Sequence, residues 1–298
     1  MSKQPNRGSQ KRRPQQRKGR TAMAAKGGKS NRTTWILVGG VLVVGIALIV
    51  AFASSDKDKG TADFVTGEKA APTSLVSKVS DVDNSIIDEV GAGSVTGLPK
   101  QLPGPILKTS DGKPRIIYIG SDYCPFCATE RWAMVNALSR FGTFKDLKIT
   151  SSAKNTRDGS PEVYPGTGTF SFNGSSFTSD YLAFEPTEQL SNTYEPLGTA
   201  TPEQQAMFDR HNKDGGIPFI DFANEYMISG ASYAPEVLQD KTRDEIAGEL
   251  TNASSDVTKG VIGTANVMTA TICKLTDNKP ANVCSNQTIQ AIQAQLPS

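Results

Sequence analysis

An apolar strand pattern that runs directly into two cysteines and a helical pattern constrains this chain more than any other feature. Residues 118–134 read YIGSDYCPFCATERWAM. The run 116–119 is continuously apolar, which is typical of a strand covered on both faces of a sheet. After Cys127, apolar side chains recur at positions 128, 132, 135, 138 and 141, which predicts a helix with one apolar face that ends near Gly142. The two cysteines are therefore expected where a helix begins after a buried strand.

A CxxC pair at a helix start has a physical logic. Cys124 would lie beside the unsatisfied N–H groups and the positive dipole end of the helix, both of which favour a thiolate. Cys127 would lie one turn further in, where it can resolve a mixed disulfide by attacking the first sulfur. Pro125 fits the first helical turn, where its missing N–H is not needed. This context favours a redox pair, with a metal site and a structural disulfide as the alternatives.

The remainder of the chain predicts an exported body on a membrane anchor. Residues 1–32 contain 11 Lys or Arg and no Asp or Glu, so 32 − 11 = 21 basic and 30 acidic residues follow, a net charge of −9. Between tail and body, residues 35–53 carry no charge and are long enough to form a transmembrane helix within 33–55. The basic tail then lies in the cytoplasm and the body outside. A cleaved signal peptide ending near Ala53 is the alternative.

Export decides how the four cysteines are interpreted. Outside the cytoplasm disulfides persist, and the spacing pairs Cys124 with Cys127 and Cys273 with Cys284. The second pair is expected to be a structural link between two helices, with an electron relay to the first pair as the alternative.

Zinc would need further ligands, and the one histidine, His211, lies in a polar stretch where a surface role is expected. We expect no metal and no cofactor, and the tail, which has no aromatic residue, is not expected to bind nucleic acid.

The body has the element order of an α/β domain. Residues 56–84 are expected to be a linker and the start of an N-terminal helix at 75–90, which Gly91 ends. From 115 onward the patterns predict strand, helix, strand, an inserted section, helix, strand, strand and helices. Before the insert, we expect a hairpin at 106–119 and a strand at 147–150. The insert is expected near 151–195, with a hairpin at 169–174 and a strand at 181–184. After it, we expect a helix from Thr201, a hairpin at 217–229, and helices in 234–250 and 257–298.

The motif GSDYCPFCATERW and the segment 216–220 resemble the thioredoxin-like fold. More narrowly, they resemble membrane-anchored thioredoxin-like proteins of actinobacteria and archaea that are catalogued only as a domain of unknown function. The resemblance covers about 100–250. It implies a thioredoxin-like domain at 85–298 with an inserted section after the first βαβ unit and extra C-terminal helices. It also implies that Pro218 is a cis-proline facing the CxxC, and that Pro125, Phe126, Ile217 and Pro218 contact the substrate.

Four residues around the motif receive structural interpretations. Glu130 and Arg131 are expected to be helix-surface charges rather than groups that tune the thiolate. Asp122 is expected to be an ordinary turn carboxylate, and Trp132 a core residue.

Together these features predict a single-pass membrane protein whose extracytoplasmic domain exchanges thiols and disulfides with exported proteins. Cys124 attacks, Cys127 resolves, and a membrane redox partner recycles the pair, with oxidation slightly favoured over reduction or isomerisation. Two other classes stay open. One is a non-catalytic binding or assembly module of a membrane complex in which CPFC only fixes the helix start, and the other is a metal-binding domain.

Overall fold

The computed structural model describes residues 63–297. The predicted tail at 1–32 and the predicted transmembrane helix at 33–55 lie outside the described residues. Among the helices of residues 63–297, none is long and apolar enough to cross a membrane.

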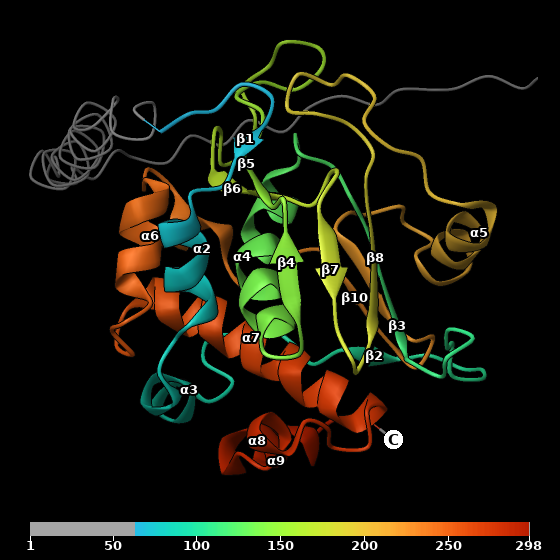
Figure 1. The fold of residues 1–298 in the computed structure, drawn as a ribbon. Helices are drawn as coiled ribbons and strands as arrows, with labels where there is room; N and C mark the ends of the chain where they lie inside the picture. Colours follow the sequence, from blue (N-terminus) through green and yellow to red (C-terminus); the bar gives the residue numbers. More distant parts are fainter. Residues whose placement is uncertain (1–62, 298) are drawn as a thin grey trace, which may run out of the picture. The chain divides into compact units, whose positions relative to one another are not determined.

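A five-stranded mixed sheet organises the described part of the chain (Figure 1). Within it, β3 (Arg115–Gly120) pairs in parallel with β8 (Ala183–Glu188) and antiparallel with β9 (Phe219–Phe222). Strands β9 and β10 (Tyr226–Ser229) form the hairpin predicted from the sequence, and β2 (Lys100–Gln101) completes the order β2-β10-β9-β3-β8. The fold is therefore a mixed α/β one, as predicted.

The apolar run in β3 is covered on both faces. Ile116 and Tyr118 belong to the main core with α4 (Pro125–Ser139), whereas Ile117 and Ile119 belong to a second core. Met207 of α5 (Pro202–His211) is a member of that second core. The alternation follows from the period of two in a strand, which sends neighbouring side chains to opposite faces.

Helix α4 is buried on all sides, which differs from the expected single apolar face. Thirteen of its 15 residues are buried. One side packs on the sheet, while α7 (Asp256–Leu275) crosses it obliquely and α2 (Thr73–Ser80) packs beside it (Figure 1). The spacing of apolar residues did not predict burial of the opposite face of α4. That face is made mostly of alanines and of polar residues that form hydrogen bonds within the core.

The inserted section lies inside the first β-α-β crossover, and the prediction that it follows this unit is wrong. The predicted strand at 147–150 forms as β5 (Lys148–Ser151), but it joins a separate three-stranded sheet, and β3 instead takes β8 as its parallel partner. The predicted hairpin at 169–174 is also wrong, because its two strands pair with different neighbours. The small sheets are β1-β5-β6 and β4-β7, made from β1 (Lys69–Ala70), β6 (Gly168–Ser171), β4 (Thr143–Lys145) and β7 (Ser176–Thr178).

The described part of the predicted linker, from residue 63 to 84, is part of the folded body. Leu75 and Val79 of α2 are buried in the main core, and Asp63 pairs with Arg243. The helix predicted at 75–90 is two helices, because Asp83 interrupts it and caps α3 (Asn84–Val90) through the backbone N–H of Ser85. The charged and glycine-rich composition of this segment predicts a solvated linker. Its few apolar residues are nevertheless enough to pack it against the main core.

The extra helices predicted at the C-terminal end are present. They follow β10 in the order η1 (Pro235–Leu238), α6 (Arg243–Glu249), α7, α8 (Ala281–Cys284) and α9 (Gln287–Gln293).

Candidate functional site

The two cysteines of the motif lie at the N-terminal end of α4, where the sequence places them. Cys124 is the N-cap residue, and its Sγ accepts a hydrogen bond from the backbone N–H of Cys127 at 3.4 Å. The Cys124 thiol also lies 3.6 Å from the carbonyl oxygen of Ile217, to which it donates. Cys124 is 5% exposed and Cys127 is fully buried, so of the two residues only Cys124 reaches the surface. Both are free thiols.

The pKa values of the two thiols are shifted in opposite directions. Hydrogen bonding from the side chain of Cys127 lowers the pKa of Cys124, against the opposing effect of burial, and the Arg131 charge lowers it further. Burial raises the pKa of Cys127 well above its usual value, and the contact with Cys124 adds to this. Local geometry therefore makes the sulfur of Cys124 the more acidic of the two.

The residues expected to contact a substrate surround Cys124. Pro125 is buried as the first residue of α4, and Phe126 is 37% exposed. The Ile217–Pro218 peptide bond is cis, and Pro218 is buried where the chain enters β9. Cys124, Phe126 and Ile217 thus come together from two segments that are far apart in the sequence.

Aromatic side chains from the inserted section and from the loop after β8 border the motif. The rings of Phe126 and Tyr164 meet edge to face with centroids 6.1 Å apart. Tyr123 and Tyr194 lie 4.7 Å apart, and the Arg157 guanidinium lies 5.3 Å from the Tyr194 ring. Nothing in the local sequence around Tyr164 and Tyr194 predicts that these segments lie beside the cysteines.

A cluster of buried charged side chains lies close to the cysteines, around Arg131 of α4. Arg131 is fully buried, and its Nη2 donates to Glu188 at 2.7 Å, while its Nε donates to Glu188 and to the Tyr118 hydroxyl. Asp122 Oδ1 is 3.4 Å from Arg131 Nη2, and burial raises the pKa of Asp122 to about 8 although the arginine acts in the opposite direction. The expectations of a surface Arg131 and an ordinary turn Asp122 are therefore wrong.

Glu130 is also fully buried, contrary to the surface role predicted for it. Its carboxylate accepts hydrogen bonds from the backbone N–H of Ser232 at 2.8 Å and from the Ser232 hydroxyl at 2.6 Å. Burial raises the pKa of Glu130 to about 7. Glu130 therefore fixes the loop after β10 to α4. Its spacing, three residues after Cys127, was the available signal, because that places both on one side of a helix.

Trp132 is a core residue, as predicted. It is fully buried, and its indole N–H donates to the Gly168 carbonyl at 3.0 Å. His211 is partly buried at the end of α5, where burial lowers its pKa. Within residues 63–297, no three His, Cys, Asp or Glu side chains are grouped in a way that could hold a metal ion.

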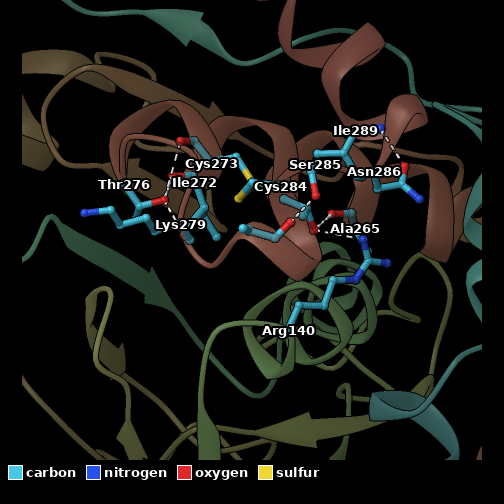
Figure 2. Close-up of a disulfide and its surroundings, with 12 residues drawn as sticks. Arg140, Ala265, Ile272, Cys273, Thr276, Lys279, Cys284, Ser285, Asn286 and Ile289 are labelled. Atoms are coloured by element: carbon cyan, nitrogen blue, oxygen red, sulfur yellow. Dashed lines mark hydrogen bonds between the residues drawn. A yellow bond between two sulfur atoms is a disulfide. The ribbon is translucent and has the colours of Figure 1, made fainter.

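The second cysteine pair forms a disulfide between α7 and α8 (Figure 2). Cys273 and Cys284 are both fully buried. Arg140, at the C-terminal end of α4, bonds to Thr269, one turn before Cys273. The two cysteine pairs therefore lie toward opposite ends of α4, a 15-residue helix about 22 Å long. The relay alternative needs the pairs to meet, and in this structure they do not.

Comparison with known proteins adds one match. A family model described as Domain of unknown function (DUF929) matches residues 105–208. The chain contains a DUF929 domain. The match begins before β3 and ends within α5, so it includes Cys124 and Cys127 and stops before Pro218 and the disulfide. No curated protein and no solved structure matches the chain.

Proposed function

We propose that this chain is a membrane-anchored thiol–disulfide oxidoreductase that acts on exported proteins, with Cys124 attacking and Cys127 resolving. The observation that carries the proposal is the asymmetry of the two thiols. Cys124 caps a helix, receives an N–H and has a lowered pKa, whereas Cys127 is enclosed and has a raised pKa. A purely structural pair has no need for this difference.

The arrangement of the sheet supports a thioredoxin-like domain within 85–298. A parallel β3–α4–β8 unit is followed by α5 and by an antiparallel β9–β10 hairpin, with the cysteines after β3 and a cis-proline before β9. In the thioredoxin-like fold that proline faces the CxxC, and here the carbonyl of Ile217 lies beside Cys124. We place the domain outside the cell membrane on the sequence evidence, that is, the basic tail and the uncharged residues 35–53.

The exchange reaction balances in either direction. In oxidation, a substrate thiolate attacks the Cys124 sulfur of an enzyme disulfide, so that the Cys124–Cys127 bond breaks and Cys127 leaves as a thiolate that takes up a proton. A second substrate thiolate then attacks the mixed disulfide and displaces Cys124 as a thiolate. The substrate loses two electrons and the enzyme gains them. In reduction the same steps run backward, and a membrane partner restores the starting state.

The acidity of Cys124 favours the oxidising direction. A lowered pKa stabilises the thiolate and therefore the dithiol form of the enzyme, which makes the disulfide form a stronger oxidant. The buried guanidinium of Arg131 contributes to this stabilisation.

The first test is the reduction potential of the purified full-length chain in defined thiol buffers, with mass spectrometry to assign which pair titrates. We expect Cys124–Cys127 to titrate between about −120 and −200 mV, the range of disulfide donors and isomerases. A value near about −270 mV would indicate a reductase. A value below about −300 mV is that of a structural disulfide, and it would favour the non-catalytic binding or assembly module instead.

The metal-binding alternative is tested on the same reduced protein by measuring zinc bound per chain. Stoichiometric zinc that Cys124→Ala removes would overturn the redox proposal. We expect no such binding.

A further inference from the structure

A polar pocket of about 310 Å³ opens at the C-terminal end of α4. Its walls come from the junction of α2 and α3, from the end of α4, and from α8 and α9. Four aliphatic side chains line part of it. The polar lining residues are Ser80, Asn84, Ser139, Arg140, Asn282 and Asn286.

Arg140 is bound in this pocket by neutral partners. Its Nη1 donates to Asn266 Oδ1 at 2.9 Å and to Thr269 Oγ1 at 3.0 Å, and its Nη2 donates to Asn136 Oδ1 at 2.6 Å. These bonds use three of the five N–H groups of a guanidinium. Figure 2 shows the side chain extending from α4 toward the helices that carry the disulfide.

Arg140 is half-buried, and the two buried arginines of the described residues have acidic partners. Arg131 pairs with Glu188, and Arg243 pairs with Asp63. Across residues 63–297, by contrast, Arg140 takes part in no ion pair. Asp88 bonds to a pocket residue, but its carboxylate accepts from the amide of Asn286.

The charge on Arg140 is only partly balanced. Burial lowers its pKa to about 9, with no carboxylate acting in the opposite direction. The C-terminal dipole of α4 supplies about half a negative charge near the guanidinium. The remainder is a positive charge beside a polar opening with no carboxylate paired to it, so the guanidinium is available to an anion.

We propose that this pocket binds the oxyanion group, carboxylate or phosphate, of a small molecule. Unused N–H groups of Arg140 supply the charge-assisted donors that either oxyanion accepts. The Ser139 hydroxyl and the Asn84 and Asn282 amides can donate to the remaining oxygen lone pairs. Ser80 already donates to Ser139, and Asn286 already donates to Asp88. The proposal is independent of the cysteine chemistry at the other end of α4.

The disulfide shapes this site. Asn282 and Val283 line the pocket from α8, and Cys284 at the end of α8 ties it to α7. Bond formation between Cys273 and Cys284 thus fixes one wall of the pocket relative to Arg140.

The test is thermal unfolding of the full-length chain in a nonionic detergent, with inorganic phosphate, sodium acetate or sodium chloride at equal ionic strength. Ligands that bind only the folded state raise the unfolding temperature in a saturable way. We expect phosphate, acetate or both to raise it more than chloride does, and the anion that acts identifies the ligand class. An equal effect of all three salts would overturn the proposal.

Asn282→Asp is the decisive variant, since it places a carboxylate at the pocket wall without removing Arg140. Asn282 is exposed and makes no hydrogen bond with its side chain among the described residues, so the fold is expected to tolerate the change. We expect anion binding to weaken at least about tenfold, which corresponds to about 1.4 kcal/mol. Asn252→Asp, the same change at an exposed position outside the pocket, is the control for net charge. Unchanged affinity in Asn282→Asp would overturn the proposal, and Arg140→Gln should abolish the response.

Discussion

The two ends of α4 carry opposite chemistry. At the N-terminal end, the sulfur of Cys124 accepts an N–H bond where the helix dipole is positive. At the C-terminal end, the guanidinium of Arg140 lies where the dipole is negative. Each end also has a cysteine pair nearby, free thiols at the first and the Cys273–Cys284 disulfide beyond the second.

Burial does not distinguish the two pairs, because all four cysteines are at most 5% exposed. The difference lies in what surrounds the sulfur atoms. Cys273 and Cys284 belong to the main hydrophobic core, whereas Cys124 has a backbone N–H, a carbonyl and a buried arginine as neighbours. A sulfur atom among apolar groups is suited to a permanent bond, and one among polar groups is suited to exchange.

The largest expected effect comes from removing one of the two thiols at the N-terminal end of α4, since Cys124 and Cys127 have different proposed roles. Cys127→Ala removes the resolving thiol, so mixed disulfides between Cys124 and substrate proteins should accumulate. Cys124→Ala should give none, and both variants should lose turnover. The measurement is non-reducing electrophoresis after acid quenching, with identification of the trapped proteins. Equal trapping by both variants would contradict the assigned roles.

The second prediction concerns the other pair. Cys273→Ala with Cys284→Ala opens a bridge between residues 11 apart, which should lower the free energy of unfolding by about 2–3 kcal/mol. Thiol–disulfide exchange at Cys124 should persist, because the second pair lies toward the other end of α4. Denaturant unfolding and an exchange assay on the same preparation test both statements. Loss of exchange in a folded variant would revive the relay interpretation.

The third prediction uses Glu130, whose pKa is raised from 4.5 to about 7. The folded state therefore holds the proton more tightly than the unfolded state does. The stability that this proton contributes is complete below about pH 4.5 and is lost as the pH rises through about 7. Glu130→Gln should remove up to about 3 kcal/mol of this pH dependence. Unfolding curves between pH 4.5 and 8 measure it, and an unchanged slope would exclude Glu130 as its source.

The smallest effect is on the acidity of Cys124. Because its lowered pKa depends first on the Cys127 side chain, the midpoint of its alkylation by iodoacetamide should lie below pH 9 and move upward in Cys127→Ala. Cys127→Ser keeps a hydrogen-bond donor at that position and should move it less. A midpoint that does not respond to either variant would assign the acidity to the helix end alone.

Local patterns predicted those parts of the fold that neighbouring residues determine. The hairpin of β9 and β10, the cap of α5 at Thr201 and the two-sided burial of β3 all follow from short stretches of sequence. The parallel partner of β3 could not be predicted this way, because Arg115 pairs with Ala183, which follows α4 and the strands β4 to β7. A strand pattern states that a strand forms, but it does not state which sheet the strand joins.

The candidate site divides in the same way. Cys124, Cys127 and Pro125 were predicted from the motif itself, and Ile217 and Pro218 from a family resemblance. The buried roles of Glu130 and Arg131 were missed, since charged residues are buried only where a partner exists. Those partners, Ser232 and Glu188, are supplied by segments that follow much later in the chain.

The distance in sequence between Cys124 and the segment that covers it has a consequence for folding. The two are 93 residues apart, and β8 and β9, which flank β3, also follow the motif by more than 50 residues. During synthesis from the N-terminus, both thiols therefore emerge before β8, β9 and the Ile217 carbonyl are available to enclose them. During that interval they differ little from any other cysteines, and the asymmetry that would direct their chemistry is acquired only when the sheet closes.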